Sequence, residues 1–253
     1  MKFWEFKNKT EKVGDLYIYG EITNEKWFDD DVTPNNFKRD LDALGNIDTL
    51  NIYINSVGGD VFSAQTMVSI LERNKAKKHV YIDGLAASAA TFPLMIADKV
   101  TIADKAMIMI HNAWSFVAGN ANELLKMADI LQKIDGNITK GYAKLSGKTE
   151  EEIQEMMNAE TWMTADEAFK NGFAHEISES MKIAAKVTDE TLILNGIELK
   201  IDQFENKDQL LETYRGLEEP EPVVDSTSTA LEPDLSEQRK QFFDLKVKIF
   251  GGK

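Results

Sequence analysis

The chain has 253 residues, of which 43% are hydrophobic and 28% charged, and this length suits one large domain with an appendage or two domains. A formal net charge of -14 argues against nucleic acid as a partner, because phosphate contacts need Lys and Arg, and the absence of cysteine excludes disulfides, cysteine nucleophiles and thiolate metal sites. The sequence has neither a signal-peptide core nor the roughly 20-residue apolar run of a membrane-spanning helix, so we expect a cytoplasmic protein without a membrane partner.

Strands and helices are expected to alternate through the first 111 residues. Runs of apolar and β-branched residues predict strands at 15–20, 49–55, 79–84, 99–104 and 106–111. A helix is expected over 33–45, where Thr33 can cap it, Pro34 suits its first position and Gly45 can end it. Further helices are expected over 60–74 and from Ser88. This alternation predicts an α/β fold with a mainly parallel sheet and crossover helices.

The second half of the chain begins with a much longer helical pattern. From Asn120 apolar residues recur at helical spacing for about seven turns, which predicts one helix over about residues 120–144. So long a helix usually extends beyond its own core and meets a partner. Two capping boxes then predict shorter helices, one at Thr149 with Glu152 and one at Thr164 with Glu167.

The chain changes character after residue 178. Residues 191–202 are expected to form a hairpin turning at Asn195 and Gly196, followed by a short helix over 206–216. Residues 217–234 are acidic and hold three of the five prolines, which predicts a linker or a disordered segment. The basic, apolar residues after them suit a docking segment, an added strand or a tail that orders only in an assembly, and a solvated segment without a role is the plain alternative. We therefore expect a domain over 1–178, an extension over 179–216, and a linker and tail over 217–253.

Three features fall where strands of this sheet end, which is where sites gather in open α/β sheets. Gly58 and Gly59 follow one strand, Ser88 follows the next, and His111 closes a third. Each has a purely structural interpretation: a tight turn, close packing among alanines, and a histidine that only fills space. Together they also supply a nucleophile, a base that activates it, and backbone N–H groups for an oxyanion, here those of Gly59 and Ala89.

Four stretches carry a resemblance to a known family: "INSVGGDV", "DGLAASAAT", "MIMIH" and "ETWMTADEAFKNGFAHEI". In order and spacing, across about residues 15–178, they resemble the signature blocks of the Clp protease proteolytic subunit (ClpP) family. The resemblance implies a crotonase-like spiral of ββα units, a Ser-His-Asp triad with Ser88 and His111, and rings that stack through a long handle helix.

The sequence departs from the family pattern at three of these positions. Glu160 aligns with the triad Asp and can still accept from the imidazole, as Glu does in some hydrolases. Asp166 lies nearby but falls inside a capping-box turn, so Glu160 is preferred, although a solvated helix-end carboxylate is its plain alternative. Val57 replaces the usual Pro before the glycines, and Ala89 replaces the usual Met, and both changes leave the backbone donors in place.

The stretch "ETWMTADEA" most resembles the corresponding sequence of the ClpP-related proteases with which tailed phages mature their heads. That subgroup implies capsid or scaffold proteins as substrates, the host cytoplasm or the prohead as location, and an AAA+ ATPase partner that is optional or absent. The leading hypothesis is a serine endopeptidase in a chambered homo-oligomer, with no metal or organic cofactor. Its extended substrate would pair beside Val57 and Gly58.

Two other functional hypotheses remain. An acyl-CoA enzyme of the crotonase group would use two backbone N–H groups on the same fold without needing a Ser–His pair. An inactive scaffold or capsid-associated protein would use the basic tail to dock a partner.

Overall fold

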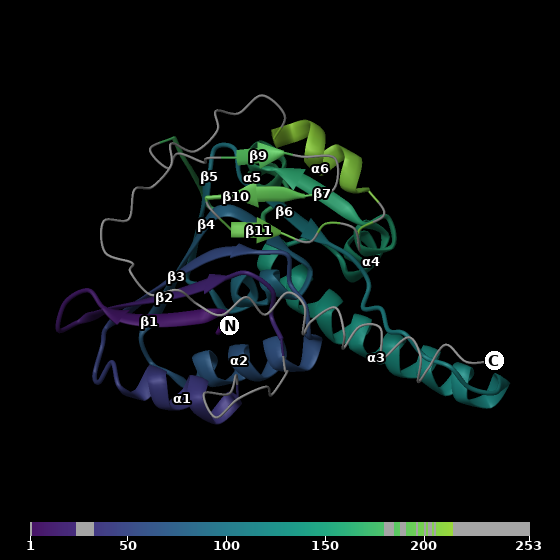
Figure 1. The fold of residues 1–253 in the computed structure, drawn as a ribbon, viewed down its shortest axis with the longest axis horizontal. Helices are drawn as coiled ribbons and strands as arrows, with labels where there is room; N and C mark the ends of the chain where they lie inside the picture. The colour runs from purple at the N-terminus through teal and green to yellow at the C-terminus, as the bar shows by residue number, and fades with distance from the viewer. Residues whose placement is uncertain are drawn as a thin grey trace, which may run out of the picture. The chain divides into compact units, whose positions relative to one another are not determined.

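The chain folds as an α/β protein around one eight-stranded sheet, shown in Figure 1 for the computed structural model. The structure describes residues 2–23, 33–179, 185–187, 191–195, 197–199, 201, 204 and 206–214. The strands of the large sheet are β1 (Trp4–Asn8), β2 (Val13–Tyr19), β3 (Thr49–Ser56), β4 (Lys77–Ala87), β5 (Lys99–Ala103), β6 (Met107–Ile110), β7 (Thr161–Thr164) and β8 (Glu176–Ser178). The predicted α/β fold is confirmed, and the predicted linker and tail over 217–253 lie outside the described residues.

The sheet is mainly parallel and divides at β4. Its order is β1-β2-β3-β4-β5-β8, with antiparallel pairing only between β1 and β2 along this path. The first half of β4 pairs with β5, whereas its last residues pair in parallel with β6, and β6 then pairs antiparallel with β7. The division brings the C-terminal ends of β4 and β6 and the start of β7 to one place.

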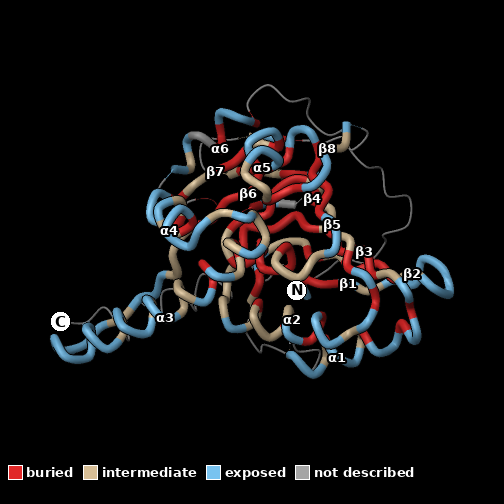
Figure 2. The backbone as a smooth tube through the Cα atoms, turned by 180° about the vertical axis from the view of Figure 1, so that it is seen from behind, coloured by how far each residue is buried: buried red, intermediate tan, exposed pale blue. Residues whose placement is uncertain are grey.

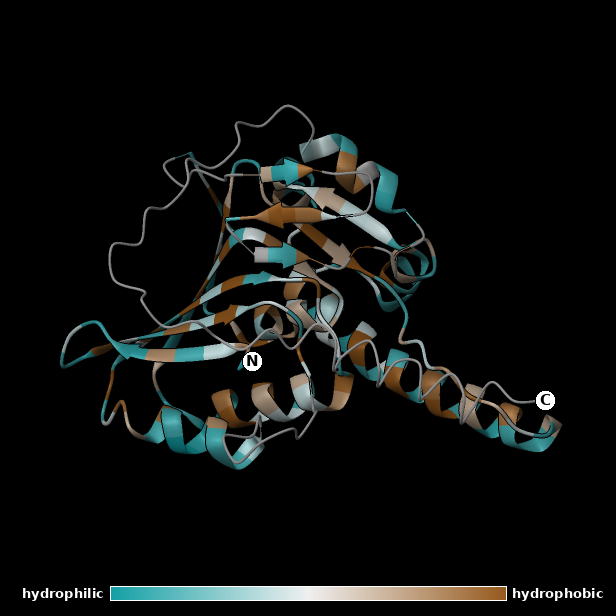
Figure 3. Ribbon diagram, in the orientation of Figure 1, coloured by the Kyte–Doolittle hydropathy of each residue, from teal (hydrophilic) through white to brown (hydrophobic). Residues whose placement is uncertain are grey.

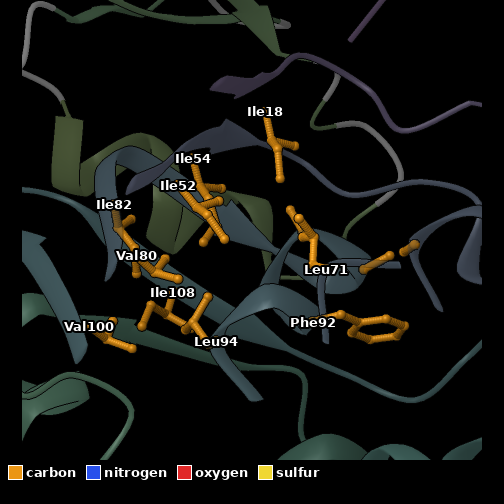
Figure 4. Close-up of a cluster of buried hydrophobic side chains, with 14 of the residues drawn as sticks. Ile18, Ile52, Ile54, Leu71, Val80, Ile82, Phe92, Leu94, Val100 and Ile108 are labelled. Atoms are coloured by element: carbon orange, nitrogen blue, oxygen red, sulfur yellow. The ribbon is translucent and has the colours of Figure 1, made fainter. Parts of the chain in front are cut away.

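Helices cover one face of this sheet and bury its largest core. They are α1 (Pro34–Asp42), α2 (Val61–Arg73) and the 3₁₀ helix η1 (Ser88–Ile96). Apolar side chains of β2, β3, β4 and β5 point toward Leu71 of α2 and toward Phe92 and Leu94 of η1, as Figure 4 shows. The expected caps are present, because the Thr33 side chain accepts from Asn36 N and Pro34 opens α1.

Two of the remaining helices begin at the capping boxes that the sequence predicts. Helix α4 (Glu150–Asn158) begins at Thr149 and α5 (Ala165–Lys170) begins at Thr164, and in each the residue three positions on completes the box. Helix α3 (Ala121–Ser146) is the predicted long helix, with Asn120 as its cap and Gly147 in left-handed geometry after its end. No helix among the described residues is long and apolar enough to cross a membrane.

Only the last turns of α3 belong to the core. Its buried residues are Ile138, Thr139 and Tyr142, whereas the preceding turns are mainly exposed and leave the body of the fold in Figures 1 and 2. Figure 3 shows hydrophobic bands along this exposed part. The helix therefore presents apolar side chains that its own sheet does not cover.

The residues after β8 build a second layer on the sheet. They form the three-stranded sheet of β9 (Ala185–Val187), β10 (Leu192–Leu194) and β11 (Ile197–Leu199), followed by α6 (Lys207–Tyr214). The predicted hairpin is confirmed as β10 and β11, with Asn195 at a φ of 51° in its turn. Side chains of this layer share a second core with the sheet, formed by Val57, Leu85, Ala87, Met107, Met109, Trp162, Ala185, Leu192, Leu194, Leu199, Ile201, Phe204, Leu210, Leu211 and Tyr214.

The structure differs from the sequence-based expectation in several elements. Strand β4 runs to Ala87 rather than ending at residue 84, and the helix from Ser88 is 3₁₀ rather than α. Pro93 lies inside that helix and supplies no N–H donor, which suits a short, tighter helix. Strands β1, β7 and β9 were not predicted. β7 and β9 are only four and three residues long, too short for a periodic pattern to show.

Candidate active site

Ser88 stands at the sharp junction between β4 and η1. It is the first residue of η1, and its backbone has a φ of 55°, which side-chain-bearing residues rarely adopt. Its neighbours Ala87 and Ala89 are buried, while Ser88 itself is half-buried. The small residues noted in the sequence therefore pack the turn and leave the hydroxyl accessible at the sheet edge.

His111 follows β6 directly, and the register of β6 with β4 brings it to Ser88. Met109 of β6 pairs with Ala87 of β4, so the residues after both strands emerge at the same edge. The His111 Nε2 atom lies 2.8 Å from Ser88 Oγ, a hydrogen-bonding distance. Just beyond, Ala113 N donates to Asp135 Oδ1 of α3 at 2.7 Å, which fixes the chain that follows the histidine.

Glu160 lies on the far side of the imidazole. It precedes β7, whose Thr161 pairs with Ile110, so the antiparallel register sets Glu160 beside His111. The Glu160 side chain is 8% exposed, and its Oε2 atom lies 3.8 Å from His111 Nδ1. That distance is longer than a direct hydrogen bond, and catalytic hydrogen bonds often tighten only when substrate binds. Asp166, the other carboxylate near this part of the sequence, is exposed in the first turn of α5.

The Gly58–Gly59 turn contacts Ser88 through its backbone. Both glycines have positive φ, 90° and 137°. A Cβ on Gly58 would meet Ala87 O, Ser88 Cβ and Ala89 N at 2.6 to 2.9 Å, and one on Gly59 would meet Ile22 O at 2.1 Å. Residues with side chains therefore cannot form this turn. It brings the backbone of Gly58 close to Ser88.

The backbone donors near this turn differ in their partners. Gly58 N donates to Ser56 Oγ at 3.1 Å, whereas no residue that the structure describes accepts a hydrogen bond from Gly59 N. Ala89 N lies in the first turn of η1, where the N–H groups of a helix have no partner within it. The Val57 side chain is 1% exposed in the second core, so Val57 could meet a substrate only through its backbone.

Backbone strain marks the same residues. The side-chain-bearing residues with positive φ in the described part of the chain are Ser88, Glu160 and Asn195. Asn195 occupies a hairpin turn, where this geometry is ordinary. Ser88 and Glu160 have no such reason, and strained backbone of this kind concentrates at functional sites.

Three residues that touch the site were not predicted from the sequence. Glu160 Oε1 accepts from Trp162 Nε1 at 3.2 Å and from Asn206 N at 2.8 Å, and the Phe204 ring lies edge-on to His111 with centroids 6.1 Å apart. Asn206 and Phe204 come from the chain before α6, more than 40 positions away from Glu160 along the sequence. The only local signal was the Asn at the start of an expected helix.

The described residues bring no three His, Asp or Glu side chains together as a metal site. The structure brings together a serine hydroxyl, an imidazole in hydrogen-bonding contact with it, a carboxylate near the other side of the imidazole, and backbone N–H groups beside the serine. This is the set of groups with which a hydroxyl can be activated.

Comparison with known proteins gives a consistent family. A family model described as Clp protease matches residues 22–181. The ATP-dependent Clp protease proteolytic subunits of Streptococcus pyogenes serotype M5 (strain Manfredo), serotype M49 (strain NZ131) and serotype M1 are each 29% identical over 150 residues, covering 56% of this chain and 75% of the relative. The family match covers more than half of the chain and includes Ser88, His111 and Glu160. The chain therefore belongs to the Clp protease family of peptidases.

Proposed function

We propose that the chain is a serine endopeptidase in which Ser88, His111 and Glu160 form the catalytic triad. The observation that carries the proposal is the 2.8 Å contact between His111 Nε2 and Ser88 Oγ. A serine hydroxyl is a weak nucleophile at neutral pH, and an imidazole in hydrogen-bonding contact is the base that activates it. In this proposal Glu160, whose Oε2 lies 3.8 Å from His111 Nδ1, stabilises the imidazolium that forms.

Acylation follows from this geometry. Ser88 Oγ attacks the carbonyl carbon of the scissile peptide bond and passes its proton to His111 Nε2. The carbonyl oxygen takes up negative charge and is met by the N–H groups of Gly59 and Ala89. When the tetrahedral intermediate collapses, the C–N bond breaks and His111 returns the proton to the leaving amine. An oxyanion donor of this kind contributes about 10²–10³-fold to the rate in known enzymes.

Deacylation repeats these steps with water as the nucleophile. His111 takes a proton from the water, which attacks the ester carbon, and the proton then returns to Ser88 Oγ as the acid product leaves. The substrate would lie extended beside residues 57–58, paired through main-chain hydrogen bonds, because the Val57 side chain is buried and cannot form a pocket wall.

The contact between His111 and Ser88 weighs against the hypothesis of an acyl-CoA enzyme. A crotonase-type reaction needs the two backbone N–H groups but neither a serine at position 88 nor a histidine in contact with it. A merely structural serine would not account for a strained φ at Ser88 beside a paired imidazole. An inactive scaffold protein would not react with a serine-directed reagent, so labelling of Ser88 distinguishes it from a peptidase.

We propose further that the peptidase works as a chambered homo-oligomer on capsid or scaffold proteins. Exposed apolar side chains on and before α3 support self-association, among them Trp114, Phe116 and Leu125. The bacterial relatives are named proteolytic subunits of an ATP-dependent protease. The substrate class rests on the resemblance of "ETWMTADEA" to phage head proteases, and in that setting an ATPase partner is optional.

Intact-mass analysis after incubation with a fluorophosphonate tests the proposal. We expect one adduct on the wild type, one on Ser69→Ala, which alters an exposed serine of α2, and none on Ser88→Ala. We also expect the wild type, but not Ser88→Ala, to cleave an unfolded protein substrate at internal bonds. No adduct on the wild type, either as purified or after assembly, would contradict the proposal, as would an adduct that survives in Ser88→Ala.

A further inference from the structure

The segment just before α6 reaches the candidate triad from outside the part of the chain that matches the family. The match ends at residue 181, whereas Phe204 and Asn206 lie in the extension that follows it. Asn206 N donates to Glu160 Oε1 at 2.8 Å, and the Asn206 side chain donates to the backbone oxygens of Ala159 and Glu160, each at 3.3 Å. Asn206 therefore holds both the carboxylate and the backbone of Glu160.

The two oxygens of the Glu160 carboxylate have different partners. Oε1 accepts from Asn206 N and from Trp162 Nε1, while Oε2 is the oxygen nearest His111 Nδ1. A glutamate has one more rotatable bond than an aspartate, so its carboxylate needs more restraint to face one direction. Two donors on Oε1 supply that restraint, and hydrogen bonds to a charged group are the stronger kind.

The aromatic residue of the same segment packs the other side of the site. The Phe204 ring lies edge-on to the His111 ring and edge-on to the Trp162 ring, with centroids 6.1 and 5.3 Å apart. Phe204 is 4% exposed, so it fills a defined place rather than a loose surface. It therefore limits how far the imidazole and the Trp162 donor can turn.

The segment is itself anchored to the sheet that carries the nucleophile. Asn55 Nδ2 of β3 donates to Leu194 O of β10 at 2.9 Å, and Tyr214 Oη of α6 donates to Gly84 O of β4 at 2.9 Å. Both bonds are buried, one on each side of residues 204–206 along the chain. Positions 204 and 206 are thus fixed relative to β4, the strand that leads into Ser88.

We propose that Phe204 and Asn206 are positioning residues of the triad, through which the extension holds Glu160 against His111. This inference rests on the proposed function, since it assigns a role toward the same site. It makes the extension part of the catalytic apparatus of this chain, although it lies beyond the matched family region. Neither residue touches the reacting atoms, and both act through Glu160 and His111.

A matched pair of variants tests the backbone donor. Asn206→Pro removes the N–H that binds Oε1, whereas Asn206→Ala keeps it and removes only the side chain. We expect the second-order rate of fluorophosphonate labelling at Ser88 to fall about 10-fold or more in Asn206→Pro and much less in Asn206→Ala. The midpoint of the rate-against-pH profile should move to lower pH only in Asn206→Pro, because a carboxylate held beside an imidazole favours its charged form.

A double-mutant cycle shows whether the effect passes through Glu160. In a Glu160→Ala background, Asn206→Pro should change the labelling rate little, because the acceptor it orients is gone. Equal losses in both backgrounds, or a wild-type rate and pH profile in Asn206→Pro, would overturn the proposal. If Asn206→Pro does not fold, Phe204→Leu serves instead: we expect the same shift in midpoint, and an unchanged midpoint would overturn the inference. If wild-type Ser88 is not labelled at all, the proposed function itself fails, a result distinct from these.

Discussion

Two residues of the candidate triad are held in backbone geometry that their side chains disfavour. Ser88 and Glu160 have φ values of 55° and 46°, each costing of order 1–3 kcal/mol. The surrounding structure compensates: Gly58 fits against Ser88 only because it has no Cβ, and Asn206 binds the Glu160 backbone. The strain is therefore imposed by contacts that are remote in sequence, which local propensity could not reveal.

The carboxyl of Asp83 predicts a pH dependence of stability that does not involve catalysis. It is partly buried on β4, and burial raises its pKa from 3.8 to about 6, although the Tyr19 hydroxyl that donates to it at 2.5 Å opposes the rise. The folded state then holds this proton more tightly than the unfolded chain, so stability falls as pH rises from about 4 to about 6. The gap between the two pKa values corresponds to about 3 kcal/mol.

We therefore expect Asp83→Asn to stabilise the protein at pH 7.5 and to change little at pH 4. The amide resembles the protonated acid and can still accept from Tyr19, so the variant avoids the cost of an ionised, partly buried carboxylate. Urea unfolding at both pH values measures the difference, expected at about 1–3 kcal/mol at pH 7.5. Asp104→Asn, an exposed carboxylate, is the control. Equal stability of Asp83→Asn and wild type at pH 7.5 would show that Asp83 stays well solvated.

Helix α3 exposes the apolar side chains of Leu124, Leu125 and Ile130, and the proposed self-association can be tested there. Leu125 is 68% exposed, and Phe116, just before the helix, is 91% exposed. We expect Leu125→Glu to reduce self-association without lowering the unfolding free energy of the protomer, because that turn touches no core. Sedimentation velocity measures the size, and Gln132→Glu, at another exposed position of α3, controls for the added charge. A Leu125→Glu protein that sediments as the wild type does would exclude this turn from the interface.

The elements show which parts of the fold were readable from sequence. The capping boxes at Thr149 and Thr164 were predicted because every residue that forms them lies within one turn. The hairpin was predicted from Asn195 and Gly196 for the same reason. The contact of Asn206 with Glu160 was not, because it joins residues 46 positions apart and depends on how the second layer packs.

Only part of the candidate site could be predicted from the sequence, because the rest again depends on contacts between residues that are distant along the chain. Ser88 and His111 were expected at one edge because parallel strands end together, and the structure places them 2.8 Å apart. Glu160 was chosen by resemblance to a family pattern and not from spacing. The 3.8 Å gap to His111, and the donors that hold Glu160, depend on the register of β7 and on the extension.

At the scale of the whole molecule, the question is whether residues 185–214 are an appendage. They contribute apolar side chains that are at most 4% exposed, including Leu192, Leu194, Leu210, Leu211 and Tyr214. Burying one such side chain is worth roughly 1.5–3 kcal/mol, and a typical domain has only about 5–15 kcal/mol of net stability. The second core is therefore large enough to decide whether the sheet stays folded.

Two truncated chains test whether residues 185–214 are an appendage or are needed for the sheet to fold. A chain of residues 1–220 should unfold in one cooperative transition, because it keeps both cores. A chain of residues 1–184 should lose that transition and bind a hydrophobic dye, because it uncovers Leu85, Met107, Met109 and Trp162 on the sheet. Both lack residues 221–253, so the difference isolates the second layer. If the shorter chain unfolded as cooperatively as the longer one, the sheet and its helices would be an independent domain, and the extension would serve the site without serving the fold.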